Sequence, residues 1–219
     1  MEVFKNNRII SISFKRGKEI MSNIIVDQLS AGYKNLSVFK NANLSISKGE
    51  IVALIGPNGA GKSTFMKVLA GLKKPTTGTV KIDGISYKDN YLEYNKLFSA
   101  IIETPSFYEE LSGIDNLKFI SNLNRVDKRE IEKIVDFIDI GKAINRKVKT
   151  YSLGMKQRLA LGMAMVSSPH FLILDEPTNG LDPQGVIEFR KLLENLAKEK
   201  DMSIIISSHI LAELEKIAT

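Results

Sequence analysis

The sequence predicts an α/β protein in which a core of strands and helices carries a helical lobe. Short apolar runs of the kind that form strands recur between 24 and 103 and again between 171 and 207. The stretch from about 112 to 166 has helical patterns instead. Strand-rich segments on both sides of a helical insert are typical of an α/β core with a helical lobe.

The first part of the chain is expected to alternate strands with one helix. The run at 51–56 is continuously apolar, which suits a strand covered on both faces of a sheet. A helix is expected to follow over 61–72 and to close at Gly71, before the turn residues Pro75 and Gly78. The other strands expected here lie at 24–29, 42–47, 79–84 and 98–103.

The lobe and the last part of the chain are expected to be mostly helical. In 128–138, four apolar residues recur at helical spacing and form one stripe, most simply a core-facing one. These residues are Ile131, Ile134, Val135 and Ile138. Another helix is expected after Ser152, then strands at 171–175 and 202–207, with helices at about 183–198 and 210–218.

Composition excludes several classes of site. The 219 residues contain no cysteine, which removes disulfides, thiolate metal sites and cysteine nucleophiles and fits a reducing cytosol. Two histidines argue against a multi-histidine metal centre. The net charge is +6, but Lys and Arg are spread along the chain, which favours a solvated surface over nucleic-acid binding. No apolar run approaches the ~20 residues of a membrane helix, so any membrane-spanning part belongs to another polypeptide.

The two ends of the chain raise separate expectations. Residues 1–20 lack the apolar core of a signal peptide, and strand-like patterning begins only after Met21. We therefore expect 1–20 to be a non-native or disordered extension and Met21 to be the native start; the alternative is a genuine basic N-terminal arm.

The stretch "GPNGAGKST" predicts a phosphate-binding loop, because it follows an apolar strand and opens a helix. Its glycines let backbone N–H groups turn towards phosphate oxygens, and the helix N-terminus adds positive potential. Lys62 is expected to reach the β- and γ-phosphates of a nucleotide, and the Ser63 hydroxyl to ligate Mg²⁺. The residues expected to bind nucleotide are Gly56, Asn58, Gly59, Ala60, Gly61, Lys62, Ser63 and Thr64.

A second motif, "FLILDEP", is expected to complete this site. Its apolar strand ends in Asp175, a carboxylate suited to Mg²⁺, and Glu176 follows directly. Glu176 is expected to polarise the attacking water. The alternative is that both carboxylates are simply solvated at a strand end.

The stretch "YSLGMKQRLALGMA" resembles the signature of the ATP-binding cassette (ABC) ATPases, and the resemblance covers nearly everything from Ile24 onward. Ser152 and Gly154 match the second and fourth positions of the family's LSGGQ pattern, followed by the matching Gln157 and Arg158. Three neighbouring positions depart from the pattern: Tyr151, Leu153 and Met155. The resemblance implies a P-loop NTPase fold with a RecA-like mixed core, an antiparallel β subdomain and a helical lobe. It makes residues 21–219 the cassette and about 112–166 its helical subdomain.

Further residues match the family in order. Tyr33 resembles the aromatic residue that stacks on adenine, Asp182 falls in the loop after the second carboxylate strand, and His209 matches the switch histidine that contacts the γ-phosphate. The family normally continues past this histidine with further strand material, so the cassette is expected to be truncated at its C-terminal end.

The resemblance also implies a mechanism and partners. Two cassettes pair head to tail, so that Ser152 and the signature helix of one close on the ATP of the other. ATP and Mg²⁺ are the implied cofactors, and hydrolysis moves integral membrane permease subunits. The implied location is cytoplasmic, peripheral on the inner face of the cell membrane, with no nucleic acid as partner.

Glu103 stands where most of the family has a glutamine that reaches the metal and the attacking water. This variant resembles the ATPase subunits that protect bacteria against lantibiotics and bacitracin-type peptides. A glutamate keeps the shape of glutamine but brings an anionic oxygen to Mg²⁺. Glu103 is thus expected to be a catalytic and metal-site residue; the alternatives are neutral drift or a residue that merely ends a strand in water.

Other function classes stay open from the sequence. One is a non-transport ABC protein that acts on DNA or ribosomes, although the long coiled-coil insert or second cassette of such chains is missing. Another is a nucleotide-binding regulator without turnover, against which Glu176 and His209 argue. Within transport, import remains an alternative to export, and the Glu103 resemblance favours export.

Overall fold

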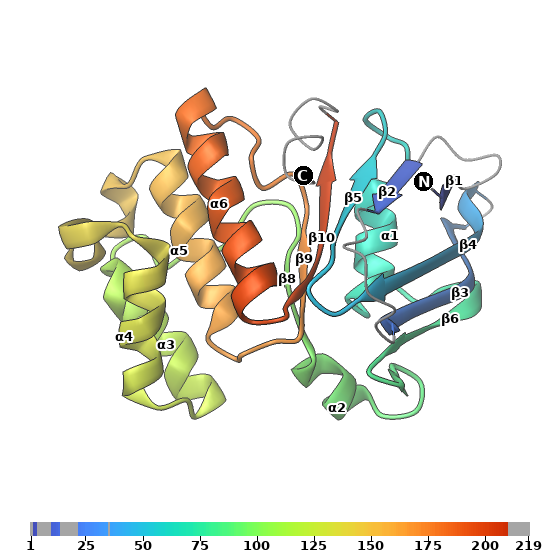
Figure 1. Ribbon diagram of the computed structural model, residues 1–219, viewed down its shortest axis with the longest axis horizontal. Helices are drawn as coiled ribbons and strands as arrows, with labels where there is room; N and C mark the ends of the chain where they lie inside the picture. Colours follow the sequence, from blue (N-terminus) through green and yellow to red (C-terminus); the bar gives the residue numbers. More distant parts are fainter. Residues whose placement is uncertain (1, 4–9, 14–21, 35, 210–219) are drawn as a thin grey trace.

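The computed structural model describes residues 2–3, 10–13, 22–34 and 36–209. Figure 1 shows a central sheet with helices α3 to α6 on one side, and with helix α1 and a second sheet on the other. This arrangement confirms the predicted α/β core with a helical lobe.

The central sheet has, in the described part of the chain, six strands in the order β1-β2-β5-β10-β9-β8. Strands β5, β10, β9 and β8 run parallel, whereas β2 joins β5 in antiparallel orientation and β1 pairs with β2. The strands are β1 (Glu2–Val3), β2 (Ile10–Ser13), β5 (Ile51–Ile55), β8 (Phe98–Ile101), β9 (Phe171–Leu174) and β10 (Ser203–Ser208).

The second sheet is antiparallel, with the described strands in the order β4-β3-β6-β7. These strands are β3 (Ser22–Tyr33), β4 (Leu36–Ser47), β6 (Thr77–Ile82) and β7 (Ile85–Ser86). β3 and β4 form a long hairpin with several register shifts along it. A short helix, α2 (Tyr91–Lys96), leads from this sheet back to the central one and was not predicted.

Side chains of the parallel strands alternate between two apolar cores. On β9, Phe171 and Ile173 face the core shared with α1 (Lys62–Leu69) and the antiparallel sheet, whereas Leu172 and Leu174 face the core under the helices. All four side chains are fully buried. This two-sided burial explains why the strand reads as a continuous apolar run rather than an alternating one.

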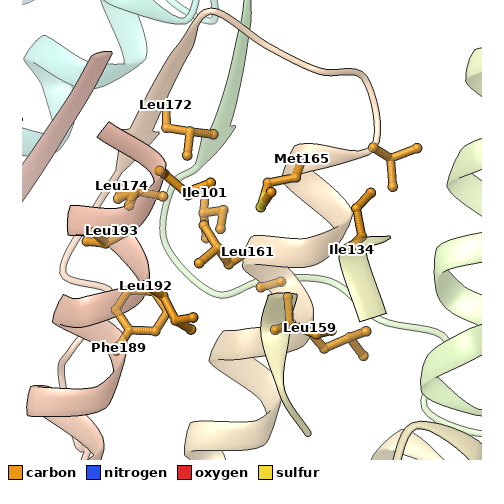
Figure 2. Close-up of a cluster of buried hydrophobic side chains, with 14 of the residues drawn as sticks. Ile101, Ile134, Leu159, Leu161, Met165, Leu172, Leu174, Phe189, Leu192 and Leu193 are labelled. Carbon is orange, nitrogen blue, oxygen red and sulfur yellow. The ribbon is translucent and has the colours of Figure 1, made fainter. Parts of the chain in front are cut away.

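The helices on the other face follow the lobe predicted from the sequence. They are α3 (Gly113–Asn124), α4 (Lys128–Ile138), α5 (Leu153–Met165) and α6 (Pro183–Glu199), with short 3₁₀ turns at Gly141–Asn145 and Val148–Thr150. In Figure 2, Leu159, Leu161 and Met165 of α5 lie between side chains of the sheet and of α6 on one side and Ile134 of α4 on the other. Burying each such side chain stabilises the fold by about 1.5–3 kcal/mol.

Helix α4 begins and ends where the sequence predicted; three residues of its stripe are buried, and the fourth, Val135, is half-buried against the same core. Ile131, Ile134 and Ile138 are at most 5% exposed. The close approach of α4 to α5 depends on Gly162, because a Cβ there would lie 3.1 Å from the Cγ2 atoms of both Ile134 and Ile138.

The structure differs from the sequence-based expectations at the end of β8 and near the N-terminus, and two expectations fall outside the described residues. The strand predicted at 98–103 ends at Ile101, so Glu103 lies in the following loop rather than at the strand end. Residues 10–13, inside the predicted N-terminal extension, form β2 along β5. Met21 and the helix predicted at 210–218 lie outside the described residues, and the proposed division of the chain into an extension and a cassette stays a prediction.

Candidate functional site

Most of the predicted site residues lie after parallel strands of the central sheet. The phosphate loop (residues 56–64) follows β5, Asp175 and Glu176 follow β9, and His209 follows β10. The loop with Glu103 follows β8. Because the carboxyl ends of parallel strands meet at one edge of a sheet, the fold gathers segments that are far apart in the sequence.

The phosphate loop turns sharply into α1. Gly59 and Gly61 have positive φ angles of 78° and 102°, a region that glycine adopts without strain. Helix α1 then begins at Lys62, and the Phe65 N–H donates to the Gly61 carbonyl at 2.9 Å. The first N–H groups of this helix have no partner within the helix, so they are available to an anion at this end.

A pocket of about 340 Å³ lies above this loop. It brings together the predicted residues of both motifs and the switch histidine. Its lining consists of Val38, Asn58, Gly59, Ala60, Gly61, Lys62, Ser63, Thr64, Glu176, Asn179 and His209. Gly56 does not line the pocket, but its carbonyl accepts a hydrogen bond from the Lys62 ammonium.

Lys62 and Glu176 face each other in this pocket. The Lys62 Nζ donates to the Gly56 carbonyl at 2.7 Å and lies 3.4 Å from Glu176 Oε1. Lys62 is only 6% exposed. A buried ammonium is stabilised by anionic partners. A phosphate that enters the pocket could therefore bind Lys62 without first reorganising this side chain.

Glu176 is also joined to His209. The His209 Nδ1 lies 2.6 Å from Glu176 Oε2, with the ring N–H as donor and the carboxylate as acceptor. Glu176 has a positive φ of 50°, which turns its side chain out of the strand direction of β9. The predicted base and the predicted switch histidine are therefore one hydrogen-bonded unit.

Asp175 is held by Ser207, a residue that the sequence analysis did not single out. The buried Ser207 hydroxyl donates to Asp175 Oδ1 at 2.6 Å and accepts from the Glu176 N–H at 2.9 Å. Ser207 therefore orients both carboxylate residues. Val38 and Asn179 of the pocket lining were missed as well, because neither belongs to the motifs used.

The oxygen atoms near this pocket fit a magnesium ion. Ser63 offers a hydroxyl and Asp175 a carboxylate, both hard oxygen ligands, and neither cysteine nor histidine is needed. Among residues 22–34 and 36–209, no cluster of three or more His, Asp or Glu side chains could hold a metal ion by itself. Mg²⁺ is commonly held by one or two carboxylates together with water and substrate phosphates, and Ser63 and Asp175 offer oxygens of that kind.

The signature residues lie in a separate, larger pocket of about 1030 Å³. Ser152 caps α5, accepting from the Met155 N–H at 3.3 Å, and Asp182 caps α6, accepting from the Gly185 N–H at 2.9 Å. Ser152, Gly154 and Asp182 all line this pocket. None of the three lines the phosphate pocket of the same chain.

Tyr33 and Glu103 also stand apart from the phosphate pocket lining. The Tyr33 ring is about half exposed, and the Lys73 ammonium lies 3.8 Å from its centroid. Glu103 forms an ion pair with Lys67 of α1, with 2.6 Å between Oε1 and Nζ. This hydrogen bond, together with the charge of Lys67, holds the pKa of Glu103 below its usual value.

Comparisons with known proteins identify the family of this chain. The profile of the ABC transporter family matches residues 39–179, more than half of the chain. The lantibiotic transport ATP-binding protein SrtF of Streptococcus pyogenes is 42% identical over 193 residues, which cover 88% of this chain and 82% of SrtF. The bacitracin transport ATP-binding protein BcrA of Enterococcus faecalis is 43% identical over 201 residues. These cover 91% of this chain but 65% of BcrA, so the chain spans less than two thirds of that relative.

Solved structures show the same fold. The ATP-binding subunit of an ABC transporter superposes with a TM-score of 0.78 at 31% identity, covering 90% of this chain and 83% of the other. CbiO1 of Clostridium perfringens, part of the ABC transporter complex cbiONQ, gives 0.81 at 27% identity over 90% and 82% of the two chains. The chain therefore belongs to the ABC transporter family, as an ATP-binding cassette that hydrolyses ATP.

Proposed function

We propose that this cassette powers the export of peptide antibiotics, or of similar peptides, through a separate membrane permease. One observation carries the catalytic part of the proposal: Lys62, Glu176 and His209 are joined in one pocket above the phosphate loop. The relatives SrtF and BcrA, which are lantibiotic and bacitracin transport ATP-binding proteins, support the substrate class.

In this proposal the phosphate loop binds the β- and γ-phosphates of ATP. Lys62 exchanges its contact with Glu176 for the phosphate oxygens, which frees the carboxylate to face the attacking water. Ser63 and Asp175 would hold Mg²⁺, with Glu103 approaching it from the loop after β8. The ion would neutralise charge on the phosphates. Ser207 keeps Asp175 oriented towards it.

Glu176 acts as the general base, or positions the water, and His209 fixes its orientation. The short contact between His209 Nδ1 and Glu176 Oε2 leaves Oε1 to accept a proton from water once Lys62 has moved to the phosphate. The same histidine lines the pocket, which supports the proposed contact with the γ-phosphate.

The signature pocket would receive the ATP of a second cassette. Ser152 and Gly154 stand at the N-terminal end of α5, where helix N–H groups favour an anion, and Asp182 lines the same pocket. Because this pocket is separate from the phosphate pocket of its own chain, a head-to-tail dimer would use both at once. Tyr33 would stack on the adenine of the bound ATP.

A separate permease would supply the path across the membrane. In the part of the chain that the structure describes, no helix is both long and apolar enough to cross a membrane. A groove of about 360 Å³ lies beside the loop with Glu103, between that loop, α3 and α5. Its lining mixes apolar side chains, such as Phe107, Ile120 and Met163, with polar ones, such as Thr104 and Ser106. We propose that a permease segment docks in this groove. Such contact would place the cassette on the inner face of the cell membrane.

Resistance in cells tests the substrate class. The chain is expressed in a peptide-sensitive bacterium together with a membrane permease that co-purifies with it, and the inhibitory concentrations of bacitracin and of a lantibiotic are measured. We expect at least one to rise, and to fall back with the Lys62→Ala variant. Unchanged sensitivity to both, with intact ATP hydrolysis in vitro, would contradict peptide export and leave the ATPase assignment standing.

A further inference from the structure

An ion pair joins the P-loop helix α1 to the loop after β8. Lys67 Nζ lies 2.6 Å from Glu103 Oε1, and the two residues are 36 positions apart in the sequence. Glu103 adopts a positive φ of 65°, an uncommon conformation for this residue type. Its side chain is 67% exposed, so burial does not fix the carboxylate and other positions are open to it. The pair thus selects one position for the carboxylate.

Lys67 also belongs to the neighbourhood of the proposed metal site. It follows Ser63 by four residues on α1, so both side chains lie on one face of the helix, slightly more than one turn or about 6 Å apart along its axis. The hydrogen bond with Glu103 raises the pKa of Lys67, so the side chain stays an ammonium. The helix geometry thus puts a cation about one turn from the Ser63 hydroxyl proposed to hold Mg²⁺.

We infer that Lys67 is a positioning residue that holds Glu103 away from the metal until Mg²⁺ and ATP are bound together. The ammonium satisfies one carboxylate oxygen of Glu103, so the carboxylate must leave Lys67 to become a metal ligand. The ammonium also repels a divalent cation near Ser63 and Asp175. Both effects act in the same direction and raise the Mg²⁺ concentration that the site requires.

The pair also explains how a glutamate is accommodated at this position. Where a neutral glutamine would add no charge, Glu103 adds one negative charge, and Lys67 cancels it. Removing either partner alone changes the charge beside the metal site by one unit, whereas removing both restores neutrality. An ordinary surface ion pair contributes little and would show no such pattern in metal binding.

The inference rests on the proposed function, because it needs Mg²⁺-dependent nucleotide binding. Four proteins test it: the parent, Lys67→Met, Glu103→Gln and the double variant. Equilibrium binding of a fluorescent, non-hydrolysable ATP analogue is measured as a function of free Mg²⁺ at low salt, where exposed charges are least screened. We expect the half-saturating Mg²⁺ concentration to fall about threefold to tenfold in Lys67→Met and to rise by a similar factor in Glu103→Gln. The double variant should lie within about twofold of the parent.

A matched control uses a second lysine–glutamate pair. Lys96 and Glu93 of α2 lie 2.7 Å apart, with no predicted site residue in contact with either, so Lys96→Met should leave the Mg²⁺ curve unchanged. Equal curves for the parent and Lys67→Met, with Mg²⁺-dependent binding intact, would overturn the inference alone, as would weaker Mg²⁺ use in Lys67→Met. Binding that does not depend on Mg²⁺ in the parent would overturn the proposed function and the inference with it.

Discussion

Ser207 and Asp175 are joined by a buried hydrogen bond of 2.6 Å between the serine hydroxyl and Asp175 Oδ1. The bond follows from strand register: Ile206 on β10 lies opposite Leu174 on β9, so the next residues of the two strands meet. The same hydroxyl accepts from the Glu176 N–H. One side chain therefore fixes the carboxylate of the proposed metal ligand Asp175 and the backbone that carries the proposed base Glu176.

Ser207→Ala should lower stability and impair metal use together. The change leaves Asp175 Oδ1 and the Glu176 N–H without this partner, and an unsatisfied buried polar group costs about 1–3 kcal/mol. Thermal unfolding should shift down by several degrees, because ~1 kcal/mol corresponds to about 2–4 °C at this chain length. The Mg²⁺ concentration that supports half-maximal ATPase activity should rise. Parental values of both quantities would show that Ser207 does not orient Asp175.

Lys62→Ala should abolish ATP binding. The β- and γ-phosphates lose their buried ammonium partner, and truncating one member of a buried charge pair weakens binding by about 100-fold or more. Equilibrium binding of labelled ATP measures this, with Lys96→Ala as a lysine control outside the site. A near-parental affinity in Lys62→Ala would remove the phosphate loop from nucleotide binding.

Tyr33 tests how adenine is held. Lys73 covers one face of the Tyr33 ring, so adenine is expected to stack on the other face. Tyr33→Ala should weaken ATP binding by about tenfold, as expected for the loss of one stacking partner, whereas Tyr33→Phe should keep most of the affinity. The binding of ATP, GTP and inorganic triphosphate is measured for the parent and both variants. Triphosphate has no base, so its affinity should be the same in the parent, Tyr33→Ala and Tyr33→Phe. An equal loss for triphosphate would place Tyr33 outside base recognition.

Tyr94 tests how much a hydrogen bond at the C-terminal end of α1 contributes to stability. Its fully buried hydroxyl donates to the carbonyl of Leu69, the last residue of α1, at 2.7 Å, and burial raises the pKa of Tyr94 so that it stays neutral. Tyr94→Phe should reduce the free energy of unfolding by about 1–2 kcal/mol in urea, with ATP affinity close to parental. Unchanged stability would show that this carbonyl finds another donor.

Local sequence predicted the parts of the site that depend on short-range geometry. The phosphate loop, the carboxylates after β9 and the stripe of α4 each lie within one continuous segment, where spacing determines the backbone. Ser207 and Lys67 escaped the analysis because their roles depend on partners 32 and 36 residues away. The strand register and the loop that bring these partners together are tertiary properties. The end of β8 was placed two residues too late, because Ile102 extends the apolar run in sequence although the pairing of β8 with β9 ends at Ile101.

Glu176→Gln tests the central claim most directly. The amide is nearly isosteric but does not accept the proton of the attacking water, whereas the Lys62 side chain that binds phosphate is unaltered. Phosphate release and ATP binding are measured on the same preparation, together with the size of the complex by size-exclusion chromatography. The account predicts that the parent releases phosphate, and that the variant binds ATP, shows no turnover and accumulates as an ATP-bound dimer. Turnover of Glu176→Gln at the parental rate would contradict the account.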